Sequence, residues 1–166
     1  MPSARYKETP SQTAGPYVHI GTLTAAAGLS IHQDKTPRLT GLDGERIVIE
    51  GTVHDGAGDL VLDAMLEIWQ AGANGSFDTA GHRGFARSMT DFKTGVFHFE
   101  TVKPGRVPND EGHLQAPHLS LLIFARGINL HLHTRLYFDD EATANSADPV
   151  LARIEDEVAR NTLLAR

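Results

Sequence analysis

The chain has 166 residues, no cysteine, a formal net charge of −6, 40% hydrophobic residues and 22% charged residues. This composition fits a single globular domain with a real core, and the lack of cysteine excludes disulfides, thiolate metal sites and a cysteine nucleophile. The basic residues do not cluster, so a nucleic-acid partner is not expected. No apolar run reaches the roughly 20 residues that span a bilayer, and the N-terminus lacks the apolar core of a secretory signal, so we expect a cytoplasmic protein.

The first residues, Met1–Gly21, are expected to form an extended arm in front of one domain that spans Thr22–Arg166. Pro10 and Pro16 support this prediction, because the residue before a proline avoids the helical region. Three long loops are expected within the domain, and long loops in compact domains are often functional. These loops are Thr22–Asp43, Gly72–Gly84 and Lys103–Pro117.

The middle of the chain predicts short strands separated by glycine turns. Arg46–Val53 is rich in β-branched residues, and Asp55–Gly58 is a turn, so Leu60–Gln70 is expected to return as the second strand of a hairpin. Phe85–Met89 and Val96–Val102 are expected to be further strands, joined by a turn at Lys93–Gly95.

The region Leu119–Phe138 predicts two strands that break at Ala125–Gly127. Leu119–Phe124 is a short apolar run, which is typical of a buried strand. From Asn129 onward, residues alternate between two faces, because strand side chains have period two. One face is apolar, whereas the other carries Asn129, His131, His133, Arg135 and Tyr137 and is a candidate functional face.

A helix is expected near the C-terminus. Asp148 is a good N-cap and Pro149 suits the first helical position. Leu151, Ile154 and Val158 follow at helical spacing. Together the elements predict a mostly-β fold, an antiparallel β-sandwich with long loops and one short C-terminal helix.

Two features of the polar face could carry chemistry. His131 and His133 project to the same side of a strand, which is a spacing that metal sites use, although surface histidines are the more common explanation. Arg135 could grip a carboxylate with two hydrogen bonds, or it could be an exposed or ion-paired arginine.

Long strings in the sequence resemble the alpha chains of the protocatechuate 3,4-dioxygenase family of intradiol ring-cleavage dioxygenases. They are ETPSQTAGPYVHIG (Glu8–Gly21), LEIWQAGANG (Leu66–Gly75), TVKPG (Thr101–Gly105) and Ala116–Ala142. The resemblance implies a β-sandwich that works with a related beta chain, in αβ pairs that assemble further. The implied reaction cleaves protocatechuate with dioxygen and non-haem ferric iron, giving 3-carboxy-cis,cis-muconate.

The resemblance also implies that the iron belongs to the beta chain. In that chain two tyrosines and two histidines hold the metal, and the matching positions here are Phe77, Val107, His118 and Ser120. Phenylalanine and valine have no oxygen to coordinate, and a serine hydroxyl is a poor ligand for ferric iron. This chain is therefore expected to hold a vestigial site without metal, and no catalytic residue of its own.

The implied role of this chain is to complete the substrate pocket at the interface with the beta chain. The matching residues are Thr13, Ala14, Gly15 and Pro16 in the arm, and Arg135. Gly15 and Pro16 suit close approach of the backbone to a ligand, and a cation would help to hold the carboxylate of an anionic substrate.

Two alternatives stay open on the sequence. The chain could be a catalytically silent structural or binding protein on the same sandwich, or an enzyme that uses His131 and His133 with another metal. Alpha chains of the family continue beyond the position of Arg166, so a chain ending there is expected to lack a sheet edge or part of the subunit contact.

Overall fold

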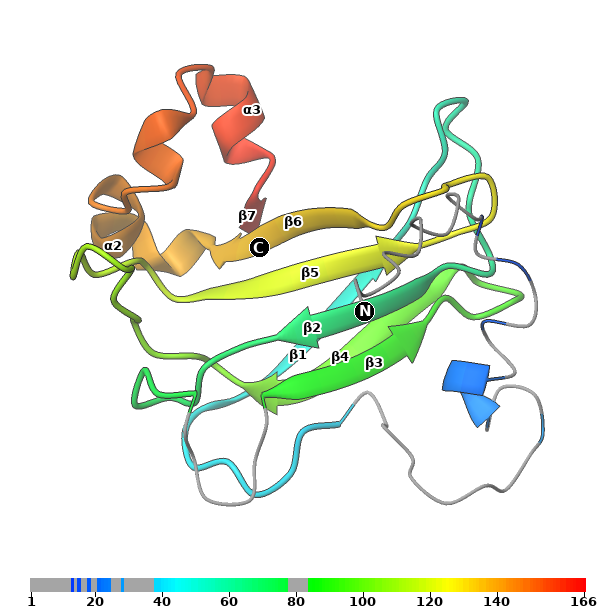
Figure 1. Cartoon of the computed structure of the whole chain (residues 1–166), viewed down its shortest axis with the longest axis horizontal. Coiled ribbons are helices and arrows are strands. Elements are labelled where there is room, and N and C mark those ends of the chain that lie inside the picture. Colours follow the sequence, from blue (N-terminus) through cyan, green and yellow to red (C-terminus); the bar gives the residue numbers. More distant parts are fainter. Residues whose placement is uncertain are drawn as a thin grey trace, which may run out of the picture.

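The computed structural model describes residues 13, 15, 18, 21–24, 28, 38–77 and 84–166. These residues form two sheets and a short helical segment near the C-terminus (Figure 1). The strands are β1 (Arg46–Thr52), β2 (Met65–Trp69), β3 (Phe85–Met89), β4 (Val96–Val102), β5 (His118–Phe124), β6 (Leu132–Phe138) and β7 (Leu164–Ala165). The helices are α2 (Ala142–Ser146) and α3 (Glu157–Asn161), with 3₁₀ turns at Asp139–Glu141 and Leu151–Arg153.

The larger sheet has five strands in the order β3-β2-β5-β6-β7, and the smaller sheet pairs β1 with β4. All pairings are antiparallel except that of β7, which runs parallel to β6. The expected mostly-β sandwich with little helix is confirmed. The described part of the chain contains no helix long and apolar enough to cross a membrane.

The predicted hairpin between Arg46–Val53 and Leu60–Gln70 is wrong. The turn itself forms, because the Val61 N–H donates to the Val53 carbonyl at 2.8 Å. The chain then crosses to the other sheet, where β2 lies between β3 and β5, while β1 pairs with β4. A period-two pattern identifies a strand but not its partner, and here the partner of β1 lies far away in sequence.

The main core fills the space between the two sheets. β2 contributes Leu66 and Ile68, which have almost no exposed surface, and β4 contributes Phe97 and Phe99. The Phe97 and Phe99 rings meet edge to face with centroids 6.0 Å apart. Burial of such side chains contributes on the order of 2 kcal/mol each, so these residues hold the sheets together.

The predicted C-terminal helix is replaced by shorter pieces. Asp148 does cap a helical turn, since its Oδ1 accepts the N–H groups of Val150 and Leu151 at 2.8 and 2.9 Å. The turn ends at Arg153, and α3 begins only at Glu157 with its own cap, Asp156. The expected apolar stripe is therefore broken, and Val158 is 75% exposed.

This helical segment covers one end of the five-stranded sheet. Ala144 and Leu151 pack with Ala116 and Tyr137 in a second apolar cluster. Figure 1 shows α2 beyond the end where β5 begins and β6 finishes, and α3 above β7 in this view. Tyr137 has no exposed surface, so the polar row predicted on β6 runs from open surface into a buried end.

Candidate functional site

Three residues that the sequence singled out meet on one face of the five-stranded sheet. Ser120 on β5 lies directly opposite Arg135 on β6, and His118 lies opposite Tyr137. Residues directly opposite on antiparallel strands point to the same face with Cβ atoms about 5 Å apart. The His118 and Tyr137 rings lie with centroids 5.5 Å apart. The sheet therefore brings His118, Ser120 and Arg135 together.

The Arg135 guanidinium is held by contacts within the chain. Its Nη1 donates to Gln115 Oε1 at 2.7 Å and to the Tyr137 hydroxyl at 3.2 Å. Within the described residues, Nε and Nη2 make no hydrogen bond, so they remain able to donate. Arg135 is half-buried, which makes a fixed cation at the edge of a buried cluster.

His118 is buried and carries no charge of its own at neutral pH. Its Nδ1 lies 2.8 Å from the Ala116 carbonyl oxygen, which can only accept, so Nδ1 carries the proton. Burial lowers the pKa of His118 below its ordinary value, and the positive charge of Arg135 lowers it further. The second nitrogen, Nε2, is consequently the one with a free lone pair.

The loops that carry Phe77 and Val107 are packed together through their backbones. The Gly105 N–H donates to the Gly72 carbonyl at 2.9 Å. A Cβ added to Gly75, whose φ is +74°, would lie 2.1 Å from the Arg106 carbonyl oxygen. Val107 is buried and accepts the Gln115 N–H at 2.8 Å, whereas Phe77 is 59% exposed.

The residues at these positions do not fit a ferric ion. Phe77 and Val107 carry no donor atom, and the Ser120 hydroxyl is a weak ligand, so one imidazole nitrogen of His118 remains. A guanidinium directly opposite Ser120 adds a positive charge where a cation would have to bind. Among the described residues, no three His, Asp or Glu side chains form a cluster that could hold a metal ion.

Thr13 lies at the other end of the same sheet. Its hydroxyl accepts the Gly127 N–H at 2.9 Å, next to the turn that joins β5 and β6. Ala125, two residues before Gly127, lies five residues beyond Ser120, the strand partner of Arg135. Five residues correspond to roughly 16 Å along a strand. Within one copy of the chain, Thr13 and Arg135 are therefore apart. Gly15 is described, but Ala14 and Pro16 lie outside the described residues, as does most of the expected arm.

A cavity of about 490 Å³ lies beside Thr13 and is also lined by His131, Glu67 and Arg87. Glu67 and Arg87 form an ion pair across β2 and β3. The His131 and Phe124 rings lie with centroids 5.3 Å apart. His133 is exposed and lies opposite Leu122 on the neighbouring strand. The histidine pair thus faces open surface on the sheet.

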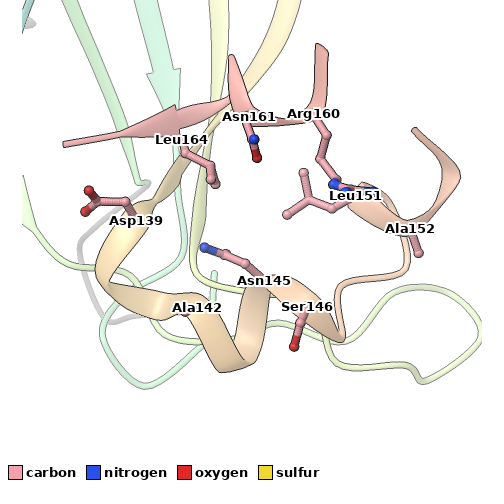
Figure 2. A pocket seen from close by; sticks show the side chains of 9 residues that line it. All are labelled: Asp139, Ala142, Asn145, Ser146, Leu151, Ala152, Arg160, Asn161 and Leu164. Atoms are coloured by element: carbon pink, nitrogen blue, oxygen red, sulfur yellow. The ribbon is translucent and has the colours of Figure 1, made fainter. Parts of the chain in front are cut away.

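A second cavity, of about 400 Å³, lies within the C-terminal helical segment and is lined by none of the site residues predicted from sequence. Figure 2 shows Asn145, Asn161 and Leu164 around it. The Asn145 Nδ2 donates to the Phe138 carbonyl at 2.6 Å, while its buried Oδ1 has no partner among the described residues. This amide fixes α2 against the end of β6.

The structure adds three residues to the site that the sequence had not predicted there. They are Gln115, Tyr137 and Asp148, all buried and all linked to Arg135 directly or through one neighbour. Asp148 was predicted only as a helix cap, and Tyr137 only as one member of the polar row. The sequence did offer one indication of the contact between Arg135 and Tyr137, because residues two apart on a strand point to the same face.

Comparison with known proteins identifies the family of this chain. A family profile described as Dioxygenase matches residues 15–166. The protocatechuate 3,4-dioxygenase alpha chain of Pseudomonas putida is 51% identical over 174 residues, covering 100% of this chain and 87% of the relative. The protocatechuate 3,4-dioxygenase beta chain of Burkholderia cepacia is 31% identical, covering 74% of this chain and 56% of the relative.

Solved structures agree on the fold. The dioxygenase domain of a dioxygenase carbohydrate-binding protein fusion from Streptomyces sp. SirexAA-E superposes with a TM-score of 0.59 at 21% identity, covering 95% of this chain and 88% of that one. At this identity the likeness supports the sandwich alone. Through the profile match and the 51% relative, the chain belongs to the intradiol dioxygenase family, on the branch of the protocatechuate 3,4-dioxygenase alpha chains.

Proposed function

We propose that this chain is a non-iron-binding alpha subunit of a protocatechuate 3,4-dioxygenase. It completes the substrate pocket of a ferric site held by a beta chain, where dioxygen cleaves protocatechuate between its two hydroxyl carbons. The observation that carries the proposal is the donor set at Phe77, Val107, His118 and Ser120, which offers one imidazole and no phenolate. The proposed partner is a beta chain, because the 51% identical relative is an alpha chain and a related beta chain exists.

In this proposal Arg135 acts on the substrate carboxylate. Its Nε and Nη2 are available to donate, and hydrogen bonds between a guanidinium and a carboxylate are among the strong ones in proteins. Thr13, Ala14, Gly15 and Pro16 form the second part of the pocket wall. Because Thr13 and Arg135 lie at different ends of the sheet, both can line one pocket only in an assembly of αβ pairs.

Expression of the chain alone and together with its beta chain tests the division of roles. The chain alone should be colourless, free of stoichiometric iron and inactive on protocatechuate. The complex should bind iron and cleave protocatechuate. Native mass spectrometry gives the number of αβ pairs. An iron-containing, active single chain contradicts the proposal, and a stable chain that never associates with the beta chain favours a silent structural protein instead.

Replacement of Arg135 by alanine tests its role within the complex. We expect a loss of roughly 1–3 kcal/mol in binding, which appears as a KM for protocatechuate raised about 5- to 150-fold with little change in kcat. Arg38→Ala is the matched control, because Arg38 is paired with Glu100 on the smaller sheet. Unchanged KM and kcat in Arg135→Ala would remove the assigned role.

A further inference from the structure

A chain of hydrogen bonds connects the C-terminal helical segment to the Arg135 guanidinium. Asp148 Oδ1 accepts from the Tyr137 hydroxyl at 3.3 Å, and the same hydroxyl accepts from Arg135 Nη1 at 3.2 Å. Gln115 Oε1 accepts from Nη1 on the other side at 2.7 Å. We call Gln115, Arg135, Tyr137 and Asp148 the arginine cluster.

The Asp148 end of the arginine cluster is fixed by the backbone. Its Oδ2 accepts the Ala116 N–H at 2.7 Å, and its Oδ1 accepts the N–H groups of Val150 and Leu151. The side chain has no exposed surface. Three backbone donors from two segments leave this carboxylate one orientation, so it serves as a rigid support for the hydroxyl that it accepts.

Tyr137 transmits this support to the arginine. The residue is fully buried and packs in the second apolar cluster with Ala116 and Leu151. Burial raises the pKa of the Tyr137 phenol, so the group keeps its proton and can donate to Asp148 while it accepts from Arg135. The direction of both hydrogen bonds is thereby set.

A free arginine side chain loses a large amount of rotamer entropy when it is immobilised. A guanidinium that is already held does not lose this entropy again when a ligand binds. Here Nη1 is used for holding, while Nε and Nη2 stay available. The two ends of the guanidinium thus have different tasks.

We infer that Tyr137, supported by Asp148, is a positioning residue that fixes the Arg135 guanidinium for a carboxylate ligand. The inference rests on the proposed function for the identity of that ligand, the carboxylate of an aromatic acid. Tyr137 does not touch the ligand, and it acts through Arg135 alone. Its contribution should therefore vanish when Arg135 is absent.

Kinetics of the αβ complex with Tyr137→Phe, Arg135→Ala and the double variant test this inference. Tyr137→Phe keeps the ring and should raise KM for protocatechuate about three- to tenfold with kcat unchanged, because a held charge becomes mobile. The double variant should have the KM of Arg135→Ala alone, since the two residues act in series. Independent effects that multiply in the double variant overturn the inference.

Two inhibitors of nearly the same shape, one charged and one neutral, separate positioning from general damage. The inhibition constant of 4-hydroxybenzoate should rise in Tyr137→Phe by the same factor as KM, while that of uncharged 4-hydroxybenzamide should stay within twofold. Gln115→Met removes the other acceptor of Nη1 and should act in the same direction. Equal weakening of both inhibitors overturns the inference.

A crystal structure of the Tyr137→Phe complex decides the matter independently of kinetics. The Arg135 guanidinium should leave its position beside residue 137 or occupy more than one position, and an unchanged single position overturns the inference. If Arg135→Ala leaves KM unchanged, the proposed role of Arg135 in substrate binding fails. In that case the crystal structure still shows whether Tyr137 holds the guanidinium.

Discussion

Asp148→Ala offers a sharp test of how the sheet and the C-terminal helical segment are joined. The substitution removes the acceptor of three backbone N–H groups and of the Tyr137 hydroxyl. The N–H groups of Ala116 and Leu151 are buried, and a buried donor left without an acceptor costs about 1–3 kcal/mol. We therefore expect a loss of about 2–6 kcal/mol, a large share of the roughly 5–15 kcal/mol that stabilises a typical domain.

Equilibrium unfolding in urea measures this loss, with Asp156→Ala as the matched control. Asp156 is also an N-cap, accepting the N–H groups of Val158 and Ala159 at 2.8 and 3.2 Å, but it is exposed. Loss of an exposed cap costs about 1 kcal/mol, because water replaces the carboxylate. If Asp148→Ala costs no more than Asp156→Ala, burial of the donors is not what makes Asp148 important, and the reasoning is refuted.

Two further predictions concern His118 and Gly75. The folded pKa of His118 lies below the unfolded value of about 6.5, so the unfolded chain binds more protons and stability should fall as pH drops below about 6.5. His118→Gln should lose less stability than the native chain between pH 7.5 and 5.5 in urea unfolding, and equal losses would contradict this assignment. Gly75→Ala should cost about 3 kcal/mol or more, because it adds a clash with the Arg106 carbonyl to the cost of a positive φ. Gly112→Ala, also at positive φ but with open space around it, should cost only about 1–2 kcal/mol, and a similar loss in both variants would show that no clash occurs.

Local patterns predicted most strands, because strand periodicity is a property of neighbouring residues. Phe85–Met89 and Val96–Val102 form β3 and β4 with the predicted bounds, and the alternation after Asn129 places Arg135 and Tyr137 on one face. The β1–β2 hairpin was predicted wrongly because strand pairing depends on contacts distant in sequence. β1 finds its partner in β4, across the whole of β2 and β3.

The site was only partly predictable for the same reason. The resemblance singled out His118, Ser120 and Arg135, and strand pairing brings these three together. The support of Arg135 by Asp148 could not be read from the sequence, because it requires the helical segment to fold back onto the sheet. The helical pattern of Leu151, Ile154 and Val158 was also misleading, since Asp156 starts a new helix within it.

The backbone contact between the loops at Gly72–Phe77 and Lys103–Val107 has a consequence for how this chain can change. Gly75 and Gly105 lie so close to main-chain atoms of the opposite loop that a Cβ at either position would clash with them, so glycine at these two positions and the opposing backbone set the path of both loops. The hydrogen bond from the Gly105 N–H to the Gly72 carbonyl is likewise a contact between main-chain atoms. If the proposed division of roles holds, a backbone framework of this kind would let related chains with and without donor atoms at positions 77 and 107 share one loop arrangement.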